Sequence, residues 1–172
     1  TRSTGIEFQV EQERVPLNSN GCDKIQFLIS VNPGEPVKPI AKIASGGELS
    51  RIMLAIQTVL SAHDDLDTMI FDEVDTGISG SAAQKVGLKL HEVSRYAQVI
   101  CITHLAQIAC LADYHLLIQK QVTENKTYTQ VIPLSKEAQI KEIARMIGGQ
   151  AITPLLLQNA QEMIDSAKQL KS

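Results

Sequence analysis

The feature that most constrains the fold is a pair of short apolar runs with an amphipathic segment between them. The runs are residues 68–71 and 98–102, and the intervening segment, residues 81–94, carries apolar side chains at helical spacing. A strand, a helix and a strand in this order form a βαβ unit, in which the two strands lie parallel. The pattern therefore predicts an α/β fold class, a mainly parallel sheet flanked by helices, with ligand chemistry at the carboxyl ends of the strands.

Two antiparallel strand pairs are predicted outside this unit. Residues 6–11 and 24–31 alternate between apolar and polar, which is typical of half-buried strands, so we expect an antiparallel pair near the amino end. Residues 114–121 and 127–133 predict a hairpin near the carboxyl end, turned at Glu124 and Asn125. Turn residues, prolines and helical periodicity predict the rest: loops at 16–23 and 32–39, and helices at 48–61, 105–111, 136–147 and 153–170.

Length and composition narrow the class of protein. The 172 residues suffice for one core, and we expect a single domain over residues 1–172 with a helical tail at 136–170. A formal net charge of −3 excludes a generally basic nucleic-acid arm or a polybasic membrane anchor. Aromatic residues make up only 3% of the chain, which disfavours a stacking platform for single-stranded nucleic acid. The first residue is Thr1 and not Met, so we expect a piece of a longer protein.

The cysteine pattern favours free thiols. Cys22, Cys101 and Cys110 are odd in number and widely spaced, so we expect buried free thiols in a reducing compartment. The four histidines form no zinc-site spacing with them.

The first motif with chemical meaning is Ser45-Gly46-Gly47-Glu48, at the start of a predicted helix. Glycines let a backbone approach a ligand, and a helix start offers unpaired N–H groups with a partial positive charge. Together with the Ser45 hydroxyl, this pattern predicts an anion site that fits a phosphate. The alternative is a glycine turn in which Ser45 or Glu48 only caps the helix.

The second motif is the acid pair Asp72-Glu73, directly after the apolar run at 68–71. Asp72 is suited to bind Mg²⁺ directly or through water, and Glu73 can accept a proton from an attacking water as a general base. The alternative is a pair of acids that cap the next turn. Asp75 follows in a tight polar loop, residues 74–77, that leads into the next helix.

The third motif is Thr103-His104, after the run at 98–102. A histidine at the carboxyl end of a strand can donate a hydrogen bond to a phosphate oxygen. The alternative is a structural histidine whose hydrogen bonds are satisfied within the fold. The functional interpretation gains weight because His104 follows the strand that is expected beside the strand of Asp72.

The last predicted helix carries an apolar stripe at alternating spacings of four and three. We expect this stripe to pack on the domain's own surface, and the alternative is a helix–helix contact with another chain. The residues of the stripe are Leu156, Ala160, Met163, Ala167 and Leu170.

In their order along the chain, these motifs resemble the ATP-binding heads of the ABC family and, more narrowly, its SMC-like members. The Ser45–Glu48 motif is similar to the ABC signature, although Ala44 stands where many ABC proteins carry leucine. The strand ending in Asp72-Glu73 is similar to Walker B, Asp75 to the D-loop acid and His104 to the switch histidine. Longer strings resemble the RecN family of bacterial DNA repair proteins; they are residues 32–35, 43–55, 71–80, 102–106 and 142–149.

The resemblance implies the carboxyl-terminal lobe of an ABC/SMC-type P-loop ATPase head, with ATP and Mg²⁺ as cofactors. The sequence contains no G-x-x-x-x-G-K-[ST] phosphate loop, so the resemblance implies that a missing amino lobe supplies it. In such a head Asp72 would bind the metal, and Glu73 and His104 would be catalytic in cis. The remaining motif residues would bind nucleotide. The signature residues Ser45, Gly46, Gly47 and Glu48 would bind the nucleotide of the opposite head, and Asp75 is the further nucleotide-binding residue.

The resemblance also implies partners and a cellular role. We expect DNA double-strand-break repair and recombination in the bacterial cytoplasm, at the nucleoid and away from membranes. The expected partners are the chain's own amino lobe, a second head in an ATP-dependent homodimer, and DNA through the full-length protein. The lobe alone is expected to be an inactive ATPase. Two alternatives stay open, a non-catalytic DNA- or partner-binding assembly module and the head lobe of another SMC-like ATPase.

Overall fold

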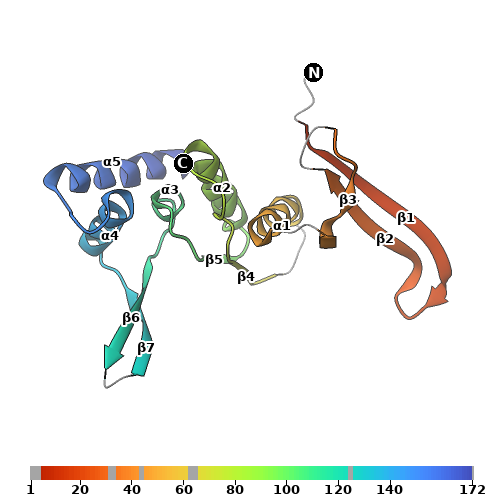
Figure 1. Cartoon of the computed structure of the whole chain (residues 1–172), viewed down its shortest axis with the longest axis horizontal. Coiled ribbons are helices and arrows are strands. Elements are labelled where there is room, and N and C mark those ends of the chain that lie inside the picture. Colours follow the sequence, from red (N-terminus) through yellow and green to blue (C-terminus); the bar gives the residue numbers. More distant parts are fainter. Residues whose placement is uncertain (1–4, 31–33, 43–44, 62–65, 124–125, 172) are drawn as a thin grey trace. The chain divides into compact units, whose positions relative to one another are not determined.

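The computed structural model describes residues 5–30, 34–42, 45–61, 66–123 and 126–171, and Figure 1 shows their helices and strands. The chain falls into two compact units, Thr1–Leu49 and Ser50–Ser172, each with its own sheets. Helix α1, Gly46–Leu60, begins in the first unit and continues into the second.

The first unit is built on an antiparallel pair, β1 (Glu7–Asn18) and β2 (Gly21–Ser30). This confirms the predicted pair, although the strands run further into the predicted turn region. Aromatic and β-branched side chains share one face of the ladder, where the rings of Phe8 and Phe27 stack with centroids 5.8 Å apart. The expectation of half-buried strands is wrong, because Phe8 is 49% exposed and Phe27 is 44% exposed.

The proline-rich segment after β2 is not all loop. Lys38–Pro39 forms a short strand, β3, which pairs antiparallel with β2 through Leu28↔Pro39 and Ile29↔Lys38. Pro39 lacks an N–H, which explains why the pairing ends there and a 3-10 turn, Ile40–Lys42, follows. Part of the predicted loop, residues 31–33, lies outside the described residues.

The second unit contains the predicted βαβ unit. Strands β4 (Thr68–Phe71) and β5 (Gln98–Cys101) pair in parallel, from Thr68↔Gln98 to Phe71↔Cys101. Helix α2, Gly80–Val93, connects them. Among the described strands this is the one parallel pair, and it forms the predicted parallel sheet between the antiparallel pair and the hairpin that were also predicted. Only one face of β4 is covered, since Met69 and Phe71 are buried whereas Ile70 is 67% exposed.

The covered face of β4 forms a core with three helices. Helices α1 and α2 and the short helix α3, Ala106–Ala109, each supply apolar side chains to this core. Those of α2 stand at the predicted helical positions, whereas α1 contributes Leu54, which the predicted apolar face of that helix does not include. Gly87 of α2 is buried, and a Cβ there would lie 2.5 Å from Cδ1 of Leu111. The core consists of Leu54, Met69, Phe71, Val74, Ala83, Leu90, Val93 and Ile108.

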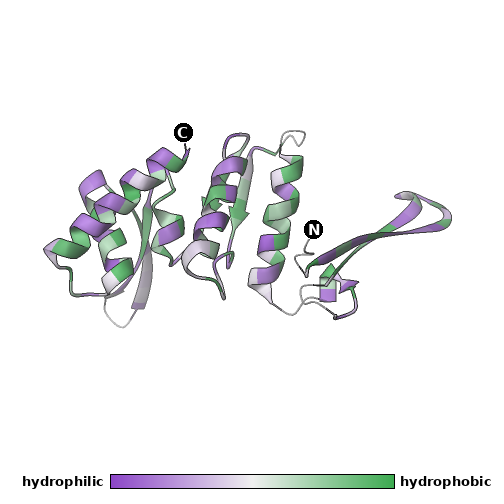
Figure 2. Cartoon of the chain, turned by 90° about the horizontal axis from the view of Figure 1, so that it is seen from above, coloured by the Kyte–Doolittle hydropathy of each residue, from purple (hydrophilic) through white to green (hydrophobic). Residues whose placement is uncertain are grey.

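The two last helices, α4 (Lys136–Gly148) and α5 (Pro154–Lys171), form a second core with α3. The α4 helix begins where the Ser135 hydroxyl accepts a hydrogen bond from the N–H of Ala138, and it ends at Gly149, whose φ of 78° suits glycine. Figure 2 shows bands of apolar and polar residues along α5, as expected of a helix with one covered face.

The apolar stripe of α5 packs within the chain, which confirms its expected use. Ala160 and Ala167 are buried, and Leu156 and Met163 pack against a cluster that contains Ile143 of α4. The stripe's last residue, Leu170, stays 50% exposed.

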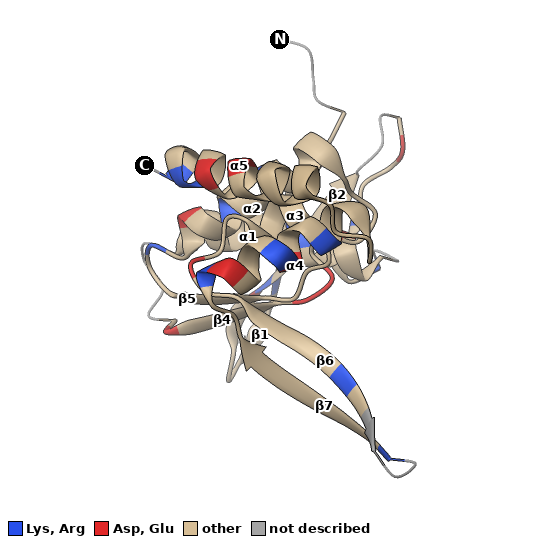
Figure 3. Ribbon diagram, turned by 90° about the vertical axis from the view of Figure 1, so that its left-hand side faces the viewer, with Lys and Arg blue, Asp and Glu red and all other residues tan. Residues whose placement is uncertain are grey.

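A hairpin, β6 (Leu116–Thr123) and β7 (Lys126–Pro133), links α3 to α4. It confirms the predicted hairpin, and its predicted turn at Glu124 and Asn125 lies outside the described residues. Figure 3 shows acidic and basic residues interspersed along α4 and α5. Within the part of the chain that the structure describes, no helix combines the length and apolar character needed to cross a bilayer.

Candidate functional site

The ends of β4 and β5 bring two of the predicted motifs together. The ladder continues one step past the strands, where the N–H of Ile102 donates to the carbonyl of Phe71 at 2.9 Å. The segments that follow, Asp72–Thr76 and Thr103–His104, therefore leave the same edge of the sheet side by side. This is the edge at which α/β folds bind ligands.

Asp75 and His104 are in direct contact at this edge. The Asp75 carboxylate is buried, and its Oδ2 accepts from the Thr103 hydroxyl at 2.6 Å and from the His104 N–H at 2.9 Å. The same oxygen lies 3.0 Å from Nδ1 of His104, whose side chain is 74% exposed. The carboxylate thus holds the ring through Nδ1, while most of the imidazole stays exposed.

These contacts govern the ionisation of Asp75. Burial raises the pKa of the carboxyl, but hydrogen bonds from Thr103 and His104, together with the charge of His104, outweigh it, and the pKa lies below the ordinary value of 3.8. Asp75 therefore stays an anion at neutral pH. Nearby, burial and the charges of Asp75 and Asp72 raise the pKa of the Cys101 thiol to about 12.

Asp72 and Glu73 project from the carboxyl end of β4 and are exposed. Oδ1 of Asp72 accepts from the N–H of Glu73 at 2.8 Å. Glu73 has a φ of 57°, the one positive φ of a non-glycine residue among the described residues. Its carbonyl accepts from the N–H of Thr76 at 3.0 Å, which closes a tight turn. The turn presents both carboxylates to solvent at the sheet edge.

Ser50 and Arg51, two neighbouring residues of α1, hold this turn. The sequence motifs did not predict either of them as a site residue. The Ser50 hydroxyl donates to the carbonyl of Asp72 at 2.8 Å. Nη1 of Arg51 donates to the carbonyls of Val74 at 3.2 Å and Thr76 at 2.8 Å. The sequence signal was a serine and an arginine directly after the first helical turn, but nothing local indicates their acceptors.

The signature-like residues lie at the amino end of α1 in the first unit, whereas the other predicted site residues lie in the second. The Ser45 hydroxyl accepts from the N–H of Glu48 at 3.4 Å, so Ser45 does cap the helix. Gly46 and Gly47 are the first two helical residues and not a separate turn. Gly46 is exposed and Gly47 is buried, so of the two glycines Gly46 is the one open to an approaching anion.

The donors present fit a magnesium ion shared with phosphates. The described residues contain no group of three His, Cys, Asp or Glu side chains arranged to hold a metal. Asp72 nevertheless offers an exposed carboxylate, which is a hard oxygen ligand. Mg²⁺ commonly takes one or two carboxylates plus substrate phosphates, so this arrangement suits Mg²⁺ better than a metal that needs a complete protein cage.

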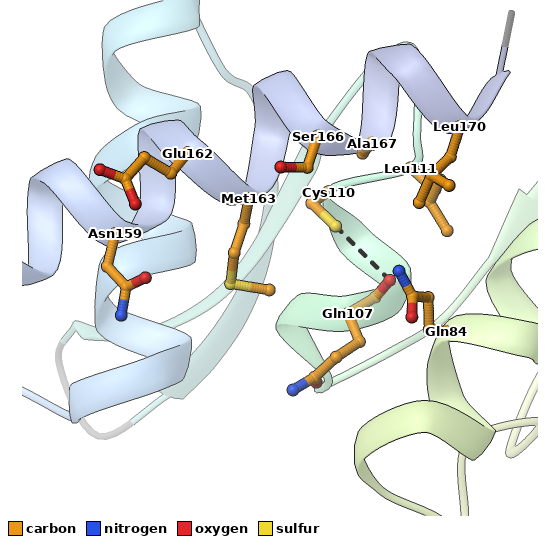
Figure 4. A pocket seen from close by; sticks show the side chains of 10 residues that line it. All are labelled: Gln84, Gln107, Cys110, Leu111, Asn159, Glu162, Met163, Ser166, Ala167 and Leu170. Carbon is orange, nitrogen blue, oxygen red and sulfur yellow. Dashed lines mark hydrogen bonds between the residues drawn. The ribbon is translucent and has the colours of Figure 1, made fainter.

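A separate pocket lies between α2, α3 and α5, and Figure 4 shows its side chains. None of the predicted site residues lines it. Met163 and Leu170 of the α5 stripe lie on one side, and Gln107 and Cys110 of the α3 region on the other. The Cys110 thiol donates to the carbonyl of Gln107 at 3.5 Å. All three cysteines of the chain are free, as predicted, but half-buried and not buried.

Comparisons with known proteins find relatives of this chain that are DNA repair proteins. No protein-family profile matches it. It is 49% identical over 163 residues to the DNA repair protein RecN of Bacillus subtilis (strain 168), which covers 95% of this chain and 28% of that protein. It is 47% identical over 167 residues to RecN of Halalkalibacterium halodurans, covering 96% of this chain and 30% of that protein. The chain therefore spans less than a third of the length of these relatives.

Solved structures show the same fold. An Smc head domain with a coiled coil and joint from Pyrococcus yayanosii matches with a TM-score of 0.57 and 24% identity, over 82% of this chain and 26% of that chain. A chain from a study of ATP-driven dimerisation and DNA-stimulated activation of SMC ATPases matches with a TM-score of 0.50 and 21% identity, over 87% of this chain and 86% of that chain. The chain therefore shares its fold with part of these structures.

Proposed function

Because the chain is homologous to RecN proteins over nearly its whole length, we propose that it is the carboxyl lobe of an SMC-like ATPase head that serves DNA double-strand-break repair and recombination. The observation that carries the proposal is the shared edge of β4 and β5, where Asp72, Glu73, Asp75 and His104 meet on the second unit. Carboxylates and an exposed imidazole at such an edge suit phosphate chemistry.

The residues at this edge would act on ATP bound by the same head. Asp72 would bind Mg²⁺, which when bound would neutralise charge on the phosphates. Glu73 would accept a proton from the attacking water as the general base. His104 would donate to a phosphate oxygen through Nε2, the ring nitrogen that does not contact Asp75. We assign Asp75, whose carboxylate is occupied by Thr103 and His104, to orienting the imidazole.

The signature-like residues would act on the opposite head. The helix start at Ser45, Gly46, Gly47 and Glu48, of which Gly46 is exposed, would bind a phosphate of the nucleotide held by a second copy. This requires an amino lobe that carries the phosphate loop and an ATP-dependent pair of heads. DNA would be bound by the full-length protein, in the cytoplasm.

The experiment that tests this proposal is reconstitution of a two-lobed head. The chain is co-expressed with an amino lobe that carries a phosphate loop, and ATP binding and hydrolysis are measured for the pair and for the chain alone. We expect turnover from the pair and none from the 172-residue chain. Robust hydrolysis by the chain alone, or no nucleotide binding by a stable pair, would contradict the proposal.

A non-catalytic assembly module has less support. The sequence features that suggested it were the α5 stripe and the acidic hairpin tip. The stripe packs against other helices of the same chain, because Leu156 and Met163 contact the cluster formed with α3 and α4. The hairpin tip lies outside the described residues. We therefore propose the ATPase lobe alone.

A further inference from the structure

The turn that carries Glu73 is fastened to α1 by two consecutive side chains. Ser50 donates to the carbonyl of Asp72, directly before Glu73. Arg51 donates through one nitrogen, Nη1, to the carbonyl of Val74, directly after Glu73, and to that of Thr76. The three acceptors thus bracket Glu73 on both sides, while the Glu73 side chain itself remains exposed.

Glu73 needs this fastening because its backbone conformation is unfavourable for a residue with a Cβ. A φ of 57° lies in the left-handed region, which non-glycine residues adopt only when their surroundings impose it. Within the turn the Glu73 carbonyl is held by Thr76, and the Glu73 N–H by Asp72. Those bonds close the turn on itself. The burial of Val74 and the bonds of Asp75 with Thr103 and His104 anchor the residues after Glu73, and the bonds from α1 add direct ties to the carbonyls on both sides of Glu73.

Arg51 is well suited to this task. Its side chain is half-buried, and it takes part in no ion pair among the described residues. Its planar guanidinium therefore serves backbone carbonyls and not a carboxylate. One terminal nitrogen carries two N–H groups in a fixed plane, so it can donate to two carbonyls at once.

We propose that Arg51, assisted by Ser50, is a positioning residue that holds the left-handed backbone of Glu73 and so aims the Glu73 carboxylate. The inference deepens the proposed function and rests on it for the role of Glu73 as general base. It assigns to Arg51 no contact with nucleotide. Loss of the clamp releases the turn, and the carboxylate then samples orientations that do not meet the attacking water.

The first test measures the turn itself and needs no ATP. In the 172-residue chain, amide hydrogen exchange is compared between wild type, Arg51→Met and Arg95→Met. Arg95 is an exposed arginine beyond α2, so it controls for loss of one charge. We expect Arg51→Met to speed exchange at the Glu73 and Thr76 amides at least tenfold while α2 and α4 keep their protection. Unchanged exchange at both amides, or faster exchange spread evenly over the unit, overturns the inference.

The second test measures catalysis in the reconstituted two-lobed head. We expect Arg51→Met and Ser50→Ala to lower kcat at least tenfold and leave KM for ATP within about twofold, because neither residue binds nucleotide. Ser50→Thr keeps the hydroxyl and Arg51→Lys keeps a donor, so both should recover part of the rate. If all four variants match wild type in kcat, the inference is wrong and the proposed function stands. If the wild-type head binds no ATP, the proposed function fails. The hydrogen-exchange experiment alone then tests whether Arg51 and Ser50 hold the turn of Glu73.

Discussion

Glu73 shows most clearly how backbone and function are linked at the level of single residues. Its left-handed φ costs about 1–3 kcal/mol, which a purely structural turn could avoid with glycine. The proposed role of Glu73 as acceptor of a proton from water would explain why a carboxylate stands in this place.

The removal of that carboxylate gives a first prediction. In a full-length protein that contains this chain, Glu73→Gln should bind ATP, keep the heads closed and lose about 10²–10⁴-fold in turnover, because the amide cannot accept the proton. The measurements are steady-state ATPase rates and the size of the assembly with ATP bound. Glu92→Gln, an exposed residue on α2, is the matched control and should behave as wild type. Normal turnover by Glu73→Gln would refute the general-base role.

Asp75 gives a second residue-level prediction, which concerns stability and pH. Asp75→Ala should destabilise the chain by about 1–3 kcal/mol at neutral pH, because it leaves the Thr103 hydroxyl and the His104 N–H without their acceptor. Folding lowers the pKa of this carboxyl below 3.8, so its contribution is present above that pH and is lost as the pH falls through the folded pKa.

The measurement is urea unfolding of wild type and Asp75→Ala at pH 7, 5 and 3. The difference between them should be similar at pH 7 and 5 and smaller at pH 3. Asp165→Ala, at an exposed ion pair with Lys168, should change little at any pH. A difference for Asp75→Ala that does not shrink toward pH 3 would mean that the charge of the carboxylate plays no part.

At the level of elements, the contact between α2 and α3 depends on a missing side chain. Gly87 is buried in the middle of α2, where glycine weakens a helix by about 1 kcal/mol relative to alanine. A Cβ at this position would lie 2.5 Å from Cδ1 of Leu111 and 3.4 Å from Cα of Ile108. The close approach of α3 explains the glycine, and α3 in turn follows directly from the His104 segment.

A larger side chain should therefore disturb this contact. We expect Gly87→Leu to destabilise the chain by about 1–3 kcal/mol through overpacking against α3, and Lys85→Leu, at an exposed position of the same helix, to have little effect. Thermal unfolding of the two variants beside wild type is the measurement. Equal melting temperatures for Gly87→Leu and wild type would show that α3 can move away without loss.

At the level of the whole molecule, charge separates the two classes of function considered for the chain. Affinity for duplex DNA rests on neutralised phosphates, and this chain has 16 basic and 19 acidic residues. Basic and acidic residues are also interspersed along α4 and α5 (Figure 3).

We expect the 172-residue chain alone to bind duplex DNA with a dissociation constant weaker than about 10⁻⁴ M at physiological salt. The measurement is a titration of labelled duplex at 50 mM and 200 mM salt, with a protein of known basic binding surface as the positive control. Tight binding that falls steeply with salt would favour the DNA-binding module over the ATPase lobe.

Much of the fold follows from local patterns in the sequence. The periodicity around Ile52, Val86 and Ile143 predicts α1, α2 and α4, and alternation or short apolar runs predict six of the strands, because each of these signals depends only on neighbours along the chain. The order of the acids, Thr103 and His104 likewise predicts a shared sheet edge. The sequence patterns predicted more buried strand residues than the structure contains. Ile70 and Phe8 remain exposed, on faces that nothing in the described chain covers.

The tertiary structure alone decided how the site is held. Ser50 meets Asp72 across 22 positions of sequence, Arg51 meets Val74 across 23, and Thr103 meets Asp75 across 28. No local pattern encodes these bonds, because each needs a side chain of one element to find a backbone carbonyl or buried carboxylate of another. For the same reason the left-handed φ of Glu73 and the burial of Asp75 became visible only in three dimensions: both are imposed by contacts between elements.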